Sequence, residues 1–228
     1  GSSINRSRAN DPEPVPYEAS NAHYRSSSPT ASYDSLKLQV AHAANTGQVL
    51  KQADINDFYI LHPNEQPYLA RFPSGLDTYY NLTSAGTSPY SSKTHYMIVK
   101  GNLWGHPDAG RIAHELLCRL IRRLGFLPSP MDVAFYIMPR PPPHAPATLC
   151  LIVDDIVVGS DEAHAEYIMN EIAKHYETKG THPVSDICNI NITRLPDGYA
   201  MDQTEYTHRL LRRHGYDVLP ASTTPLES

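Results

Sequence analysis

Two adjacent aspartates, Asp154 and Asp155, interrupt an otherwise apolar run over residues 148–160. The flanking segments, 149–153 and 156–158, are mostly aliphatic and β-branched, which is typical of a buried strand or of the two strands of a hairpin. Ionised carboxylates are costly to bury without a partner, so this feature requires either a cation or access to water. The chain must therefore fold so that a strand or hairpin carries two acids at one point.

Two interpretations of this doublet are open on its residues alone. In the first, the carboxylates bind a divalent cation, and a hard ion such as Mg²⁺ suits paired aspartates. In the second, the doublet is a hairpin turn with both side chains in water, although the tightest hairpin turns prefer Asn-Gly or Asp-Gly. The rest of the chain has to decide between a metal site and a turn.

The composition excludes several classes of protein. With 228 residues, 40% of them hydrophobic, the chain is long enough for a real core in one large domain or two small ones. Its net charge of −5 argues mildly against a dedicated nucleic-acid binder. The 3 cysteines and 12 histidines form neither a disulfide framework nor a zinc-ligand spacing, which fits a reducing intracellular compartment. No apolar run is long enough to predict a membrane span.

The spacing of apolar residues, caps and breakers predicts a series of helices and strands. Residues 1–30 are rich in Ser, Asn, Arg and Pro and are expected to form a disordered leader. Helices are expected over 31–44, 107–125, 161–180 after a Ser160 cap, and 202–215, and strands over 48–60, 131–138, 148–160 and 187–193. This order predicts an α+β fold with a mixed or antiparallel sheet and helices packed on one face.

Several segments carry motifs in a recognisable order. Val153-Asp154-Asp155 with Gly159 forms one, and Lys51-Gln52-Ala53-Asp54-Ile55 forms another. Further motifs are Leu103-Trp104-Gly105, Ala109-Gly110-Arg111, Leu124-Gly125-Phe126 with Asp132, Asp197-Gly198, Leu210-Leu211 and Thr224-Pro225-Leu226. Together they resemble the reverse transcriptases of Copia-type retrotransposons, in which the first motif is the catalytic hairpin and the second begins the palm.

The resemblance implies a palm-like polymerase core over residues 31–180 and a post-palm segment over 181–228 that carries a basic helix. It implies that Asp54, Asp154 and Asp155 are catalytic and bind Mg²⁺ or Mn²⁺ for nucleotidyl transfer by two metal ions. It also implies nucleotide or template contacts for Arg111 and Gly105, and backbone contacts for Arg209, Arg212 and Arg213. A solvated helix face is the alternative explanation for these arginines.

The chain also departs from the family pattern. Pro107-Asp108 replaces the family's Lys-Gln, and the basic fingers segment expected before the palm is absent. We therefore expect a truncated and divergent domain with incomplete fingers.

The leading hypothesis is a reverse transcriptase domain of a Copia-type polyprotein. It would act on an RNA or DNA template with primer and dNTPs, in company with other regions of the polyprotein. Its expected location is intracellular, in the cytoplasm, a virus-like particle or the nucleus, without a membrane partner. One alternative is a catalytically inactive palm-fold module for nucleic-acid binding or protein interaction. Another is an unrelated α/β domain in which the doublet is only a turn.

Overall fold

The computed structural model describes residues 28–71, 96–103, 106 and 108–216. Most of the predicted leader over 1–30, Gly105 and the motif at 224–226 therefore lie outside the described residues. The elements are α1 (Tyr33–Thr46), β1 (Val49–Asp54), β2 (Pro63–Arg71), β3 (Tyr96–Gly101), α3 (Ala109–Arg123), β4 (Leu127–Pro128), β5 (Phe135–Met138), β6 (Ala147–Ile152), β7 (Asp155–Ser160), α4 (Glu162–Ala173), β8 (His182–Pro183), β9 (Asp186–Ile187), β10 (Ile190–Leu195), β11 (Gly198–Asp202) and α5 (Thr204–His214).

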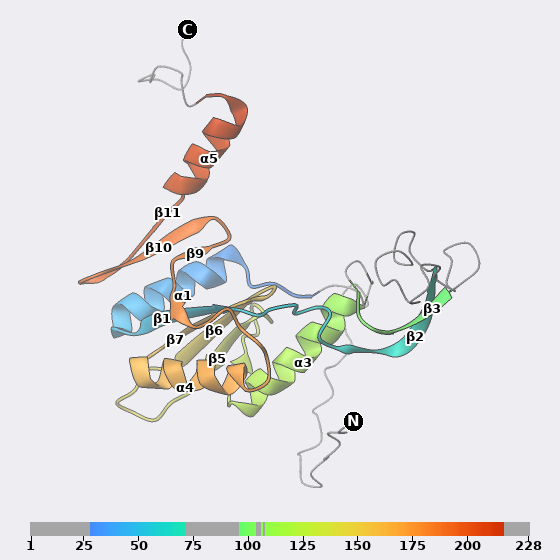
Figure 1. Cartoon of the computed structure of the whole chain (residues 1–228). Coiled ribbons are helices and arrows are strands. Elements are labelled where there is room, and N and C mark those ends of the chain that lie inside the picture. The colour runs from blue at the N-terminus through green and yellow to red at the C-terminus, as the bar shows by residue number, and fades with distance from the viewer. Residues whose placement is uncertain (1–27, 72–95, 104–105, 107, 217–228) are drawn as a thin grey trace.

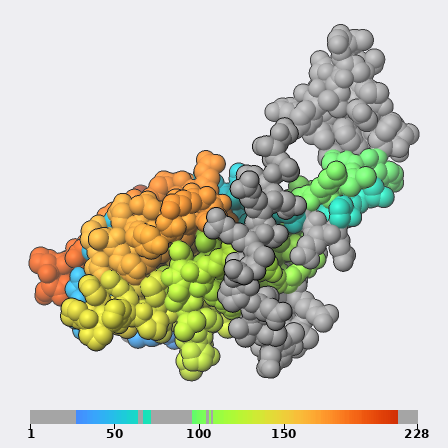
Figure 2. Space-filling model, turned by 90° about the horizontal axis from the view of Figure 1, so that it is seen from below, coloured from blue at the N-terminus to red at the C-terminus, as the bar shows by residue number. Residues whose placement is uncertain are grey.

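A six-stranded sheet with the order β4-β5-β6-β7-β1-β8 forms the centre of the molecule (Figure 1). All its pairings are antiparallel. β6 and β7 are the arms of a hairpin, and β1 pairs with β7 although it lies far earlier in the chain. The predicted α+β class with an antiparallel, palm-like sheet is confirmed. The strands β2 and β3 form a separate ribbon that projects from this body (Figure 2).

Helices cover both faces of the central sheet. On one face α3 and α4 pack against β6 and β7, through Leu117, Ile121, Ile168, Ile172, Leu149, Leu151 and Ile156. On the other face α1 and the β9–β10 hairpin pack through Leu36, Val40, Cys150, Val157, Ile187 and Ile190. The expectation that helices lie on one face therefore holds only for α3 and α4. Successive side chains of β6 point to opposite faces and all are apolar or buried, so both faces need a cover.

Helix α3 buries Ile112 and Leu120 as well as Leu117 and Ile121, so its buried face does not follow a strict four-residue repeat. Leu117 and Ile121 are fully buried, whereas Leu116 and Leu124 are only half-buried. Four residues turn an α-helix by more than one full turn, so a strict four-residue series drifts around the axis. The helix predicted over 107–125 ends at Arg123, and Gly125, with φ 98°, follows its cap residue Leu124.

Two predicted boundaries differ near the ends of β1 and α4. β1 ends at Asp54 rather than at residue 60, because the chain turns there and places Phe58 in the core. α4 begins after Asp161, whose carboxylate accepts a hydrogen bond from the backbone N–H of His164 at 3.0 Å. Ser160 is not the cap, since it is the last residue of β7. α4 stops at Ala173, so the next segment returns to β1.

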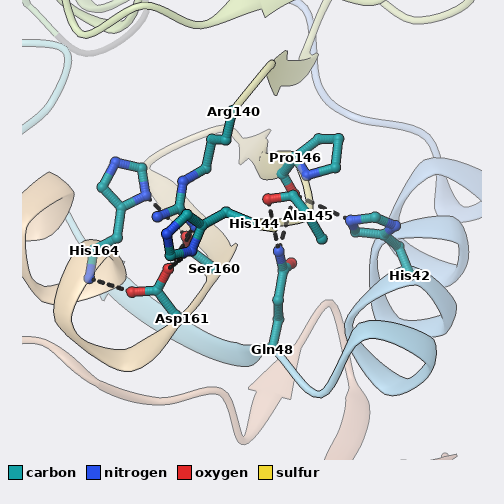
Figure 3. Close-up of polar contacts among 9 residues, drawn as sticks. All are labelled: His42, Gln48, Arg140, His144, Ala145, Pro146, Ser160, Asp161 and His164. Carbon is teal, nitrogen blue, oxygen red and sulfur yellow. Dashed lines mark hydrogen bonds and ion pairs between the residues drawn. The ribbon is translucent and has the colours of Figure 1, made fainter. Parts of the chain in front are cut away.

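The Pro-rich loop over residues 139–146 contacts both α4 and the α1 end of the sheet (Figure 3). Arg140 donates to Asp161 at 2.5 Å and to the Ser160 hydroxyl at 3.2 Å, which joins the loop to the start of α4. On the other side Gln48 donates to the carbonyl of Pro146 at 3.0 Å, and the His42 ring lies 3.1 Å from the same oxygen. These contacts fix the end of the sheet opposite to the aspartates.

Asp132 joins the start of α1 to the turn before β5. Its carboxylate accepts hydrogen bonds from the Ser35 hydroxyl at 2.6 Å and from the backbone N–H groups of Ser32 and Ala134 at 2.8 and 3.0 Å. Partial burial raises the pKa of this carboxyl, but the hydrogen bonds outweigh it and hold the pKa below its usual range. Asp132 also shortens the strand predicted over 131–138, because the turn it holds delays β5 until Phe135.

Replacing Asp132 with Asn should destabilise the fold by about 2 kcal/mol, since hydrogen bonds to a charged group are lost or weakened. The depressed pKa gives stability that is present above the ordinary carboxyl pKa and lost as pH falls through the folded value. In urea unfolding, the difference between parent and variant should therefore be largest at pH 7 and should shrink as pH falls below the ordinary carboxyl pKa of about 3.9. Asp34→Asn, at an exposed first-turn carboxylate of α1, is the matched control and should change stability by less than about 1 kcal/mol.

Candidate active site

The sheet brings together the acidic residues predicted to act together. Asp54, the last residue of β1, lies directly opposite Asp155, the first residue of β7. Residues opposite one another in an antiparallel pair point to the same face, so their carboxylates are neighbours. Asp154 lies in the turn between β6 and β7, and its carbonyl accepts the backbone N–H of Ile55 at 2.9 Å. Acids from distant parts of the sequence therefore meet at one end of the sheet.

The turn that carries Asp154 is strained. Val153 and Asp154 connect Ile152 to Asp155, and Val153 has a φ of 61°. A β-branched residue is disfavoured in this left-handed region, at a cost of order 1–3 kcal/mol. The turn interpretation of the doublet thus describes the backbone of Asp154 correctly. The side chains, however, are half-buried rather than fully in water.

The carboxylates interact electrostatically. Burial raises the pKa of Asp155, and the neighbouring charges of Asp154 and Asp54 raise it further, while a hydrogen bond from Gln52 opposes the change. Burial, together with Asp154, also raises the pKa of the Tyr59 hydroxyl, which places this ring within the field of the same carboxylates. Three acids that repel one another at a half-buried site favour the binding of a cation.

Lys179 supplies a positive charge that sequence reasoning missed. Its ammonium group lies 2.7 Å from Oδ2 of Asp54, and this contact raises the pKa of Lys179. The backbone fixes its place, because the N–H of Lys179 donates to the carbonyl of Asp54 at 3.1 Å and Thr178 bridges to Ile55. No spacing in the sequence relates Lys179 to Asp54, since the early end of α4 creates the contact.

Gln52 donates a hydrogen bond to the Asp155 carboxylate. The Gln52 side chain is 7% exposed, and its Nε2 donates to Oδ1 of Asp155 at 3.3 Å and to the carbonyl of Asp186 at 3.1 Å. The sequence motif contained Gln52 but gave it no role. The pairing of β1 with β7 explains the contact, because Gln52 lies two residues before Asp54 on the same face.

The site has the ligands that a hard cation needs, although they are not arranged as a metal site. Carboxylate oxygens are the preferred protein ligands of Mg²⁺. Among the described residues, no group of three or more His, Cys, Asp and Glu side chains has an arrangement that would hold a metal ion. The carboxylate oxygens are thus of the type that Mg²⁺ binds, although their present arrangement does not form a metal site. In this arrangement Lys179 neutralises the charge of Asp54.

The predicted contact arginines lie on two helices. Arg111 is in the first turn of α3 and forms ion pairs with Asp108 at 3.4 Å and Glu115 at 2.9 Å. Arg209, Arg212 and Arg213 lie on α5, which buries none of its side chains and extends away from the sheet (Figure 1). Gly105 lies outside the described residues.

A family model described as reverse transcriptase (RNA-dependent DNA polymerase) matches residues 17–228. The chain belongs to this family. The reverse transcriptase domain is 19% identical over 202 residues to the retrovirus-related Pol polyprotein from transposon RE2 of Arabidopsis thaliana. The match covers 87% of this chain and 13% of the relative, so the domain spans a small part of that polyprotein. The predicted resemblance to Copia-type reverse transcriptases is confirmed.

Among solved structures, the domain is similar to telomerase from Candida albicans, determined in complex with the TWJ fragment of telomeric RNA. The identity is 11%, the TM-score is 0.34, and the match covers 84% of this chain and 39% of the telomerase chain. No helix in the described part of the reverse transcriptase domain has both the length and the apolar character needed to cross a membrane.

Proposed function

We propose that this domain is the RNA-directed DNA polymerase core of a retrotransposon polyprotein, and that it extends a primer with dNTPs on an RNA or DNA template. The observation that carries the proposal is the register that sets Asp54 opposite Asp155, with Asp154 in the adjoining turn. Membership of the reverse transcriptase family supports the proposal. Nucleotidyl transfer by metal ions requires carboxylates that lie close together, and this register brings three of them to one end of the sheet.

Asp54, Asp154 and Asp155 would hold Mg²⁺ or Mn²⁺ in this proposal, as reverse transcriptases generally use divalent metals. Bound ions would favour deprotonation of the primer 3′-hydroxyl and neutralise charge on the triphosphate. Asp54 and Asp154 would be the principal ligands, and Asp155 would assist them. Lys179 has to leave Asp54 or share it when a cation binds, because its ammonium group now occupies one of the two oxygens.

The template and primer would be held through their phosphates. Arg209, Arg212 and Arg213 lie on one helix, and guanidinium groups form forked hydrogen bonds with phosphate. Arg111 and Gly105 would approach the incoming nucleotide or the template, and Arg111 would exchange one of its carboxylate partners for phosphate.

The test is primer extension on poly(rA) with an oligo(dT) primer, in Mg²⁺, in Mn²⁺ and with EDTA. The parent should incorporate dTTP only with a metal ion. Asp154→Asn should lose at least about 100-fold, because the metal contributes several kcal/mol to the transition state and each 1.4 kcal/mol is tenfold in rate. Asp57→Asn is the matched control and should retain activity. It lies three residues after Asp54, is exposed, and has a φ of 51° that Asn also adopts.

Equal incorporation by the parent and Asp154→Asn would remove the proposed role of the doublet. Salt-dependent binding of the primer–template without any extension would instead support the inactive nucleic-acid-binding module.

A further inference from the structure

The basic helix α5 has no fully buried side chain. None of its residues is buried, and Tyr206, Leu210 and Leu211 remain 38%, 42% and 37% exposed. A helix of 11 residues is marginally stable in water when nothing packs against it. α5 follows β11 directly, and the backbone N–H of Thr204 donates to the Asp202 carboxylate at 2.9 Å, which fixes only the start of the helix. Side-chain contacts further along α5 therefore help to set its direction relative to the sheet.

One such contact joins α5 to the turn between β9 and β10. The Arg209 guanidinium donates a hydrogen bond to Oδ1 of Asn189. Arg209 also lies over the Tyr206 ring, with 5.7 Å between its Cζ and the ring centroid, which restricts the rotamers of the arginine. Cys188 and Asn189 form the turn with φ values of 52° and 63°. Asn tolerates this left-handed conformation better than most residues, so the backbone holds the Asn189 amide at the tip of the turn.

The same turn is also connected to Asp155, through hydrogen bonds of the Gln52 side chain. Gln52 donates to the Asp186 carbonyl at 3.1 Å and to Asp155 at 3.3 Å, and its Oε1 accepts the backbone N–H of Ser185 at 3.5 Å. Ile187 and Ile190 are buried at the base of the turn, so it cannot move freely from the sheet. A continuous series of contacts thus runs from Asp155 through Gln52 and the turn to Arg209.

We propose that Asn189 is a positioning residue, which sets the basic helix α5 at a fixed place relative to the aspartates and so aligns bound primer–template with them. This inference rests on the function proposed above. Arg209 has five N–H donors, so it can contact Asn189 and still donate to a phosphate. Arg212 and Arg213 then meet the sugar–phosphate backbone from a helix whose position is already defined.

Amide hydrogen exchange of the whole chain tests the contact itself. Asn189→Ala should speed exchange in α5 at least about fivefold, because the helix loses a contact that holds it. Asn170→Ala, at an exposed asparagine of α4, is the matched control and should leave exchange in α5 unchanged. Asn189→Asp should restore protection, since a carboxylate accepts the Arg209 hydrogen bond and Asp also adopts a positive φ. Equal exchange in parent and Asn189→Ala would overturn the proposal.

Steady-state kinetics test the role in alignment. Asn189→Ala should raise KM for poly(rA)–oligo(dT) about fivefold while the KM for dTTP stays near the parent value, and Asn189→Asp should recover the parent value. The double variant Asn189→Ala, Arg209→Gln should show the same rise in KM as Arg209→Gln alone, because both changes break one contact. Additive effects, or a change in the KM for dTTP alone, would overturn the proposal. A parent that neither binds nor extends primer–template would defeat the proposed function, whereas the exchange result decides the contact independently.

Discussion

Gly159→Ala is expected to destabilise the fold by about 3 kcal/mol, at the upper end of the cost of overpacking a core. Gly159 lies opposite Thr148 in β6 and opposite Leu50 in β1. A Cβ at this position would lie 2.6 Å from Oγ1 of Thr148 and 3.1 Å from Cδ2 of Leu50. Thr148 cannot easily move aside, because it is buried and accepts a hydrogen bond from Gln39 at 3.2 Å.

Urea unfolding followed by circular dichroism measures this loss, which is a large part of the 5–15 kcal/mol typical of a domain. Gly101→Ala is the control, because its Cβ would meet nothing closer than the carbonyl of His62 at 3.9 Å. Thr148→Ala in the Gly159→Ala background should recover part of the loss, since it removes the clashing oxygen. An unfolding midpoint in Gly159→Ala equal to that of the parent would contradict the prediction. It would show that β6 and β1 move away from β7 at little cost.

Asp155→Asn is expected to lower primer extension at least about tenfold and to stabilise the metal-free fold by up to about 1 kcal/mol. Activity should fall because Asp155, an assisting metal ligand in the proposed function, loses its charge. Stability rises because the change removes a half-buried charge that Asp154 and Asp54 repel, while the Asn oxygen still accepts from Gln52. A carboxylate cluster that binds a cation, as proposed for these aspartates, is expected to be less stable without the cation.

The gain in stability of Asp155→Asn should depend on pH in a defined direction. A raised carboxyl pKa means that the parent loses stability as pH rises from the ordinary value of about 3.9 through the folded value. The gain in Asp155→Asn should therefore be absent near pH 3 and complete at pH 8, in thermal unfolding with EDTA. Adding Mg²⁺ should raise the melting temperature of the parent more than that of the variant. A variant less stable than the parent at pH 8 would contradict the repulsion between the carboxylates.

Local sequence signals predicted the parts of the fold that local physics controls. The helices predicted over 31–44 and 202–215 are present as α1 and α5. Gly47 and Gly215 end them with positive φ, because glycine adopts this conformation without a steric cost. Asp197-Gly198 of the sequence motifs lies where β10 turns into β11, with Leu195 paired to Gly198. Boundaries that depend on distant contacts were wrong. α4 stops before Gly180 because residues 177–179 pair with the end of β1, and no local signal marks that pairing.

The sequence by itself determined that acids on an apolar hairpin need compensation, and its ordered motifs determined the family. Only the tertiary structure decided which groups surround those acids. Lys179, Gln52 and the Asn189 turn come from three separate segments. The antiparallel pairing of β1 with β7 brings Gln52 to Asp155, and the bridge between Thr178 and Ile55 brings Lys179 to Asp54. Side-chain periodicity indicates which face of a strand is buried, but it does not indicate which other strand pairs with it. The partners of a charged group are therefore set by strand order and register.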